Sequence, residues 1–340
     1  MKKKQMLGIV VAGIVFIAVC ATGVLSNVLT NKLMQTEKTS TTGLWSDLMS
    51  KMEETEIELP TEDFIGVIDV VGTIQASSSG SGWTSSNEGY DHDLYMDYID
   101  QLEDAENNKG ILLYVNSPGG TVYESDELYL KLMEYKEVTK RPVYAYFGSQ
   151  ACSGGYYIAM AADKIYANRN CWTGSIGVIV SLTNCKKLYD KLGIKEIDIT
   201  SGKNKAMGSS GLDLTEEQYD ILQSLVDEAY DQFTDIVSQG RKMDIATVKK
   251  IADGRIYSAK QAKKNGLVDE TGSLEDLKAV IQKENNLSED ITYHKAESAG
   301  SDFFSSLLGF ADQFKEKSDT ELAVDIIENR GNGVLMYYAD

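Results

Sequence analysis

Residues 111–135 read Ile-Leu-Leu-Tyr-Val-Asn-Ser-Pro-Gly-Gly-Thr-Val-Tyr-Glu-Ser-Asp-Glu-Leu-Tyr-Leu-Lys-Leu-Met-Glu-Tyr. The stretch opens with an apolar run, residues 111–115, that has the length and composition of a buried strand. A loop follows at 116–120, and Leu128, Leu132 and Tyr135 then recur at the spacing of one helix face. A buried strand that leads through a glycine-rich loop into an amphipathic helix is typical of a parallel sheet with helical crossovers.

The same alternation continues on both sides of this stretch. Apolar runs predict further strands at residues 64–74, 142–147 and 164–167. Periodic patterns predict helices at residues 94–102, 153–162, 215–239, 246–251 and 274–283. We therefore expect an α/β fold with a largely parallel sheet.

The composition is that of a globular protein with an acidic surface. The chain has 340 residues, and 52 Asp and Glu against 33 Lys and Arg give a net charge of −19. Such a charge repels phosphate backbones, so nucleic acid is not an expected partner. The four cysteines show no metal-type spacing, and we expect free thiols and no metal site.

The N-terminus has the pattern of a membrane anchor. Lys2, Lys3 and Lys4 precede an uncharged apolar run at residues 7–25, which is long enough to span a bilayer as a helix. The positive charge on one side predicts a single-pass protein with a cytoplasmic N-terminus and the remaining chain outside the cell. A cleaved signal peptide is the alternative, because small residues lie near the end of the run.

Two loops carry residues suited to catalysis. In a parallel sheet, the loops that leave the carboxyl ends of the strands gather at one edge. In the loop at residues 116–120, the paired glycines let a ligand come close to the backbone, and they allow the backbone amides to point at an oxyanion. In the second, Ser153 precedes Gly154 at the start of a predicted helix, where its hydroxyl would be a nucleophile. Taken alone, the two motifs also fit a turn and a helix cap.

A serine nucleophile needs a base, and histidine does not fit the pattern. The chain has two histidines, His92 and His294, and neither follows the serine motif at a short interval. A lysine whose pKa is lowered by burial is the remaining option. Lys203 and Lys205, in the polar segment 200–208, are the candidates, and side-chain chemistry does not choose between them.

These motifs together resemble the signal peptide peptidases of the SppA family, within the ClpP/crotonase superfold. The resemblance extends over residues 64–277 and rests on Gly72-Thr73-Ile74, the loop 116–120, the segments 153–157 and 161–165, and 173–178. It implies repeated ββα units, with Ser153 as nucleophile and Lys205 as base. It also implies that the amides of Gly120 and Gly154 form the oxyanion hole and that Ser175 orients the lysine.

The activity implied by the resemblance is that of a serine endopeptidase with a Ser/Lys dyad and no cofactor. Its substrates would be remnant signal peptides and other small apolar peptides derived from the membrane. Longer members carry two copies of this domain, so a single copy is expected to form a ring-shaped homo-oligomer in which Lys205 serves the Ser153 of a neighbour. The rivals are a crotonase-type acyl-CoA hydratase or isomerase and an inactive membrane scaffold of the same fold.

Four regions are expected along the chain. They are an anchor at residues 1–26, a tether at 27–60, a peptidase domain at 61–297 and a C-terminal tail at 298–340. The apolar end of the tail, residues 334–338, fits either a last strand or an extended peptide that lies in the substrate groove.

Overall fold

The computed structural model describes residues 57–77, 89–296 and 336–338. The described residues belong to one compact unit, which begins at Ile57. The expected anchor and nearly all of the tether lie outside the described residues, as does most of the tail. Within the described part, no helix combines the length and the apolar character needed to cross a membrane.

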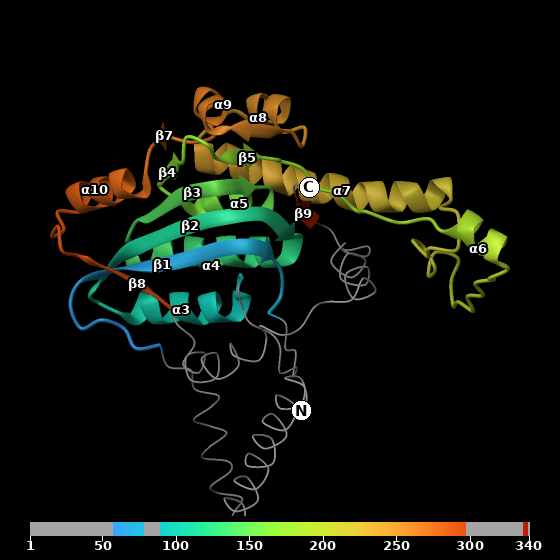
Figure 1. The fold of residues 1–340 in the computed structure, drawn as a ribbon, viewed down its shortest axis with the longest axis horizontal. Coiled ribbons are helices and arrows are strands. Elements are labelled where there is room, and N and C mark those ends of the chain that lie inside the picture. The colour runs from blue at the N-terminus through green and yellow to red at the C-terminus, as the bar shows by residue number, and fades with distance from the viewer. Residues whose placement is uncertain (1–56, 78–88, 297–335, 339–340) are drawn as a thin grey trace, which may run out of the picture. The chain divides into compact units, whose positions relative to one another are not determined.

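The core of the unit is a mostly parallel sheet whose centre is built from three long strands. They are β1 (Phe64–Ile74), β2 (Asn108–Thr121) and β3 (Val143–Cys152). The order across the sheet is β6-β5-β3-β2-β1-β8, with β5 (Trp172–Gly174), β6 (Ile256–Ser258) and β8 (Thr292–Lys295). Two more strands, β4 (Lys164–Ala167) and β7 (Glu270–Thr271), pair beside β3 (Figure 1). The predicted α/β class is confirmed.

Helices cover the two faces of the sheet unequally. One face packs against α3 (His92–Asp104), α4 (Val122–Thr139), α5 (Gly154–Ile158) and the second half of α7 (Glu216–Arg241). The other face packs against α10 (Leu274–Glu284) through a smaller cluster with Leu277 and Ile281. The short helices α8 (Ile245–Ile251) and α9 (Ala259–Lys264) complete the unit.

Three predicted boundaries are wrong in the part of the chain that carries the candidate motifs. The strand expected at 142–147 is β3, which continues to Cys152. The expected loop at 116–120 is the continuation of β2, because Asn116 pairs with Val71 and Gly120 with Ile74 after a shift in register. Gly119 has a φ of 111°, which lets the strand continue past Pro118. The expected helix at 153–162 is α5 followed by a single 3₁₀ turn at Ala159–Ala161.

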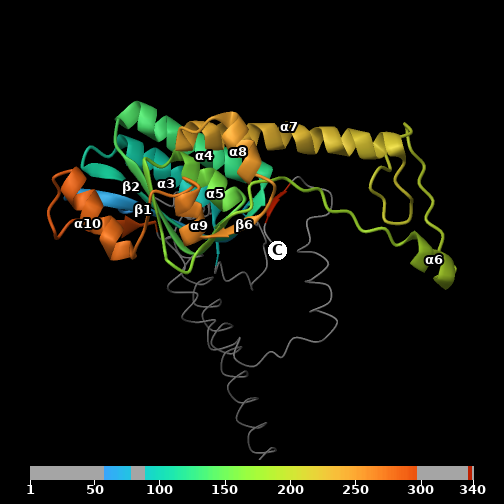
Figure 2. The ribbon, with the colours of Figure 1, turned by 90° about the horizontal axis from the view of Figure 1, so that it is seen from above.

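An arm that the sequence patterns did not predict projects from the sheet (Figures 1 and 2). We define the arm as residues 178–215, which contain α6 (Lys186–Leu192) and end at the start of α7. No residue of α6 is buried, and the buried residues of α7 begin only at Ala229. The capping box between Thr215 and Gln218 begins α7 far from the sheet.

An ion pair fixes the end of α7 to the sheet. The Arg241 guanidinium donates to both carboxylate oxygens of Asp269 at 2.7 and 3.1 Å, and the Ile165 amide donates to the same carboxylate at 2.7 Å. Burial alone would raise the pKa of Asp269, but these hydrogen bonds and the charge of Arg241 outweigh it and lower the pKa. The carboxylate is therefore held ionised in the folded protein.

We expect Asp269→Asn to lower the free energy of unfolding at pH 7 by about 2 kcal/mol, less than for a fully buried pair because the carboxylate is partly exposed. The pKa is lower in the folded state, so the carboxylate stabilises the fold at pH values above its ordinary 3.8 and loses this effect as the pH falls through the folded value. Urea unfolding from pH 7 towards pH 3 should show the difference from the wild type shrinking. Glu275→Gln, which removes an exposed ion pair with Lys278, is the control. If the difference in the free energy of unfolding between Asp269→Asn and the wild type did not change with pH, the lowered pKa of Asp269 would be contradicted.

Candidate active site

Ser153 lies where β3 ends and α5 begins, in a strained backbone conformation. Its φ and ψ are 52° and −118°, in a region that residues with a Cβ rarely occupy. Its amide donates to the Gly174 carbonyl at 2.8 Å, and its carbonyl accepts from the Tyr157 amide at 2.9 Å. Both ends of the serine are thus fixed by the neighbouring strand and helix.

The Ser153 hydroxyl has no structural task in the described part of the chain. The side chain is fully buried, and its Oγ has no hydrogen-bond partner among the described residues. It makes no capping bond to α5, so the alternative of an ordinary helix cap is not supported. A buried polar atom without a partner and a strained backbone both cost free energy, and this combination is typical of functional positions.

Gly120 lies at a point where only glycine fits. A Cβ at this position would lie 1.8 Å from the Ile74 carbonyl oxygen. Gly155 also lies close to β2, because a Cβ there would lie 3.2 Å from Val115 and 3.3 Å from Ser117, which is a tight contact. The first turn of α5 therefore lies directly on the end of β2, and Gly120 and Gly154 share the carboxyl edge of the sheet.

Ser117 shapes this edge and was not recognised from the sequence as a separate feature. Its hydroxyl donates to the Gly72 carbonyl at 2.6 Å and accepts from the Gly119 amide at 3.0 Å. Ser117 is fully buried. It therefore fixes the path of the backbone just before Gly120.

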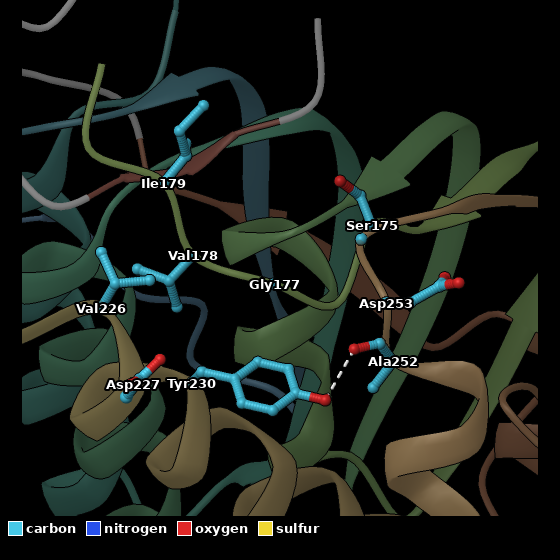
Figure 3. Close-up of a pocket in the computed structure, with 10 residues that line it drawn as sticks. Ser175, Gly177, Val178, Ile179, Val226, Asp227, Tyr230, Ala252 and Asp253 are labelled. Atoms are coloured by element: carbon cyan, nitrogen blue, oxygen red, sulfur yellow. Dashed lines mark hydrogen bonds between the residues drawn. The ribbon is translucent and has the colours of Figure 1, made fainter. Parts of the chain in front are cut away.

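Ser175 lies beside a cavity of about 440 Å³. It has a φ of 49°, and its amide donates to the Arg255 carbonyl at 2.8 Å. Figure 3 shows Ser175 and Asp253 on one side of the cavity and Val178 and Val226 on the other. The ring of Tyr230 closes the end of the cavity, where its hydroxyl donates to the Ala252 carbonyl at 2.8 Å.

The two candidate lysines lie in the arm, between α6 and α7. Both views show that this part of the chain lies at the far end of α7, away from the sheet (Figures 1 and 2). Lys203 is paired with Glu217 at 2.7 Å. Lys205 is exposed, and its ammonium has no partner among the described residues. Within one chain, the structure brings Ser153, Gly154, Gly120 and Ser175 together and leaves Lys205 apart from them.

A strand from the C-terminal tail runs along the edge of the site. β9 (Met336–Tyr338) pairs antiparallel with the end of β2, with Tyr337 opposite Gly120. The end of β2 can therefore pair with an extended segment, and in this structure that segment is β9.

Cys152, next to Ser153, is not suited to be the nucleophile. Burial raises the pKa of its thiol to about 12. The thiol is therefore protonated at physiological pH, and a protonated thiol is a poor nucleophile.

Known proteins are similar to this chain in sequence. The sequence model of peptidase family S49 matches residues 136–288, and that of the Clp proteases matches residues 65–175. A protein of Enterococcus faecium, provisionally named signal peptide peptidase SppA, is 39% identical over 258 residues, which are 76% of this chain and 74% of that protein. Protease 4 of Haemophilus influenzae is 32% identical over 70% of this chain, and chloroplastic serine protease SPPA of Arabidopsis thaliana is 31% identical over 56%. The matched regions are 36% and 28% of these two longer proteins.

We expect Gly120→Ala to destabilise the fold by about 3 kcal/mol, because a Cβ cannot be accommodated against the backbone of β1. Thermal unfolding should show a lower melting temperature. Gly202→Ala is the matched control, because nothing lies within 4 Å of a Cβ at that position. Equal melting temperatures for the two variants would show that β1 and β2 separate without cost at this point.

Proposed function

The chain belongs to the SppA family of serine peptidases, and we propose that it cleaves peptides through an acyl-enzyme with Ser153 as nucleophile and Lys205 as base. The observation that carries the proposal is the fully buried Ser153 hydroxyl, which has no partner in the described part of the chain and sits on a strained backbone. In a structural role, such a hydroxyl would have a hydrogen-bond partner.

The proposed reaction has two steps. The Ser153 Oγ attacks the peptide carbonyl while the uncharged Lys205 amine takes its proton and passes it to the leaving amine. Water then hydrolyses the ester, with the same amine as base. The amides of Gly120 and Gly154 stabilise the oxyanion in both steps, and the Ser175 hydroxyl orients the amine.

This chemistry requires Lys205 to be buried. A lysine accepts a proton only when it is uncharged, and burial favours the uncharged form. Lys205 is exposed in the single chain, so a partner must cover it. We propose that this partner is a second copy of the chain. The arm of one copy would enter the cavity beside Ser175 of the second copy, which brings Lys205 to the Ser153 of that copy.

The surface of the arm supports assembly with another copy. Ile197 is 72% exposed and Ile199 is 98% exposed, and Leu188, Leu192 and Ile194 are exposed as well. An exposed apolar surface of this kind is typical of an interaction site. When each arm binds the next copy, the contact is head-to-tail, and rotational symmetry closes it into a ring.

The substrates that we propose are extended peptides, in particular remnant signal peptides and other small apolar peptides from the membrane. The pairing of β9 with residues 119–121 supports the binding of such a peptide as an added strand. In this proposal, the tail of the chain occupies the substrate groove. The proposed anchor at residues 1–26 holds the catalytic domain on the outer side of the cell membrane, where these peptides are released.

The two rival functions leave the main observation without an explanation. An acyl-CoA hydratase or isomerase of this superfold would use the amides at the sheet edge but not the serine, and an inactive scaffold would use neither. A single substitution at Ser153 therefore separates the peptidase from both rivals.

We expect Ser153→Ala and Lys205→Ala each to abolish hydrolysis of a fluorogenic peptide, because each removes one half of the proton transfer. Lys203→Ala is the matched control, from the same segment, and should keep most of the activity because Lys203 is paired with Glu217. Circular dichroism would verify that all three variants are folded. Full activity in Lys205→Ala together with loss in Lys203→Ala would reverse the assignment.

Mixing tests whether the site is shared between copies. When inactive Ser153→Ala and Lys205→Ala proteins exchange subunits at random, about a quarter of the sites should combine an intact serine with an intact lysine from the neighbour. We expect peptidase activity to recover to about this fraction. Differentially tagged subunits would show that mixed oligomers have formed. Mixed oligomers without recovery would show that serine and lysine come from the same chain.

A further inference from the structure

The buried hydroxyl of Tyr157 joins three helices. It donates to the Asp126 carboxylate at 2.5 Å, and it accepts from the Gln232 side-chain amide at 2.8 Å. Asp126 belongs to α4, Tyr157 to α5 and Gln232 to α7. Tyr157 itself is fully buried. A buried polar group at the meeting point of three elements fixes their relative positions, because moving any one of them breaks a hydrogen bond.

Each of these helices leads to a different part of the proposed site. α4 begins at Val122, two residues after Gly120. α5 begins at Gly154, three residues before Tyr157. α7 continues from Gln232 back to its start at Glu216, where the arm with Lys205 ends.

We propose that Tyr157 is a positioning residue that holds the Gly120 and Gly154 amides in the spacing that an oxyanion needs. The inference rests on the proposed function, because it assigns the two amides to the same oxyanion. α5 has only five residues, so its own hydrogen bonds do not fix its position on the sheet. Donors of an oxyanion hole act through their exact placement, and a displacement of about 1 Å can lower a rate about 100-fold.

The ring of Tyr157 is held independently of its hydroxyl. It packs edge-on against Tyr129, with ring centroids 5.5 Å apart, and against Phe233 at 5.0 Å. Tyr157→Phe therefore keeps the ring that makes these contacts and removes the hydroxyl that bonds to Asp126 and Gln232. Asp126 is partly exposed and Gln232 is exposed, so water can replace the lost partner and the fold should persist.

The test is a comparison of kcat, KM and inhibitor affinity in the full-length protein. We expect Tyr157→Phe to lower kcat about 10- to 100-fold and to leave KM within about twofold, because the change affects the transition state alone. The affinity for a peptidyl aldehyde, whose adduct with the serine carries an oxyanion, should fall by the same factor as kcat/KM.

Tyr129→Phe is the matched control. Tyr129 is a buried tyrosine of the same aromatic cluster, and its hydroxyl has no hydrogen bond to any described residue. We expect its kinetic constants to stay within about twofold of the wild type. A fall in kcat equal to that of Tyr157→Phe would mean that loss of any hydroxyl from the aromatic cluster impairs the enzyme. That result would overturn the specific role of the Tyr157 hydroxyl.

A second pair of variants tests the link itself. Asp126→Ala should reproduce the kinetic defect, while Asp126→Asn, which keeps an oxygen acceptor, should restore most of the rate. The double variant Asp126→Ala/Tyr157→Phe should be no slower than either single variant, because both remove the same interaction. Wild-type kinetics in Tyr157→Phe, with Ser153→Ala inactive, would overturn this inference alone. An active Ser153→Ala would instead overturn the proposed function.

Discussion

The close contact between α5 and the end of β2 is the constraint on which the candidate site depends. The helix lies so close to the strand that a Cβ at position 155 would crowd Val115 at 3.2 Å and Ser117 at 3.3 Å. The strand can in turn lie against β1 only because position 120 has no side chain. These two contacts let the Ser153 hydroxyl and the neighbouring amides approach one another at the edge of the sheet. The hydrogen bonds of Ser117 to Gly72 and Gly119 then hold the backbone between them.

The sequence predicts the centre of the fold well because the buried strands carry an unmistakable apolar pattern. Residues 64–74 form β1 as expected, and 164–167 form β4. The prediction is less accurate at residues 116–120, where Pro118 and two glycines indicate a loop but the backbone continues as a strand. Local residue preferences favour a turn at that point, and pairing with β1 overrides them. The contribution of such pairing is not visible in a single sequence.

The motifs of the site are also visible in the sequence, but their spatial relation is only partly so. Ser153, Gly154 and Ser175 follow the ends of strands and Gly120 lies in the last part of β2. The topology of a parallel sheet brings such positions together. Lys205 follows no strand, and its distance from the sheet depends on the direction of α7. α7 has 26 residues and its buried residues begin at Ala229, so its first half projects beyond the sheet. Its amphipathic pattern alone does not show at which residue the contact with the sheet begins. Ser117 and Tyr157 stayed unrecognised because their roles depend on partners 45 and 31 residues away.

The antiparallel pairing of β9 with the end of β2 has a consequence for how peptides are distinguished at this edge. A peptide bound there as a strand has its direction fixed, and its successive side chains point alternately to opposite faces of the sheet. One face meets α4 and α5 and the other face points away from them, so neighbouring residues of the peptide have different surroundings. Such an edge selects peptides by their alternating pattern of side chains. A shift of one residue in register moves every side chain of the peptide to the opposite face. Two peptides of identical composition but different order would then be distinct ligands, while unrelated peptides with the same alternating pattern would be equivalent.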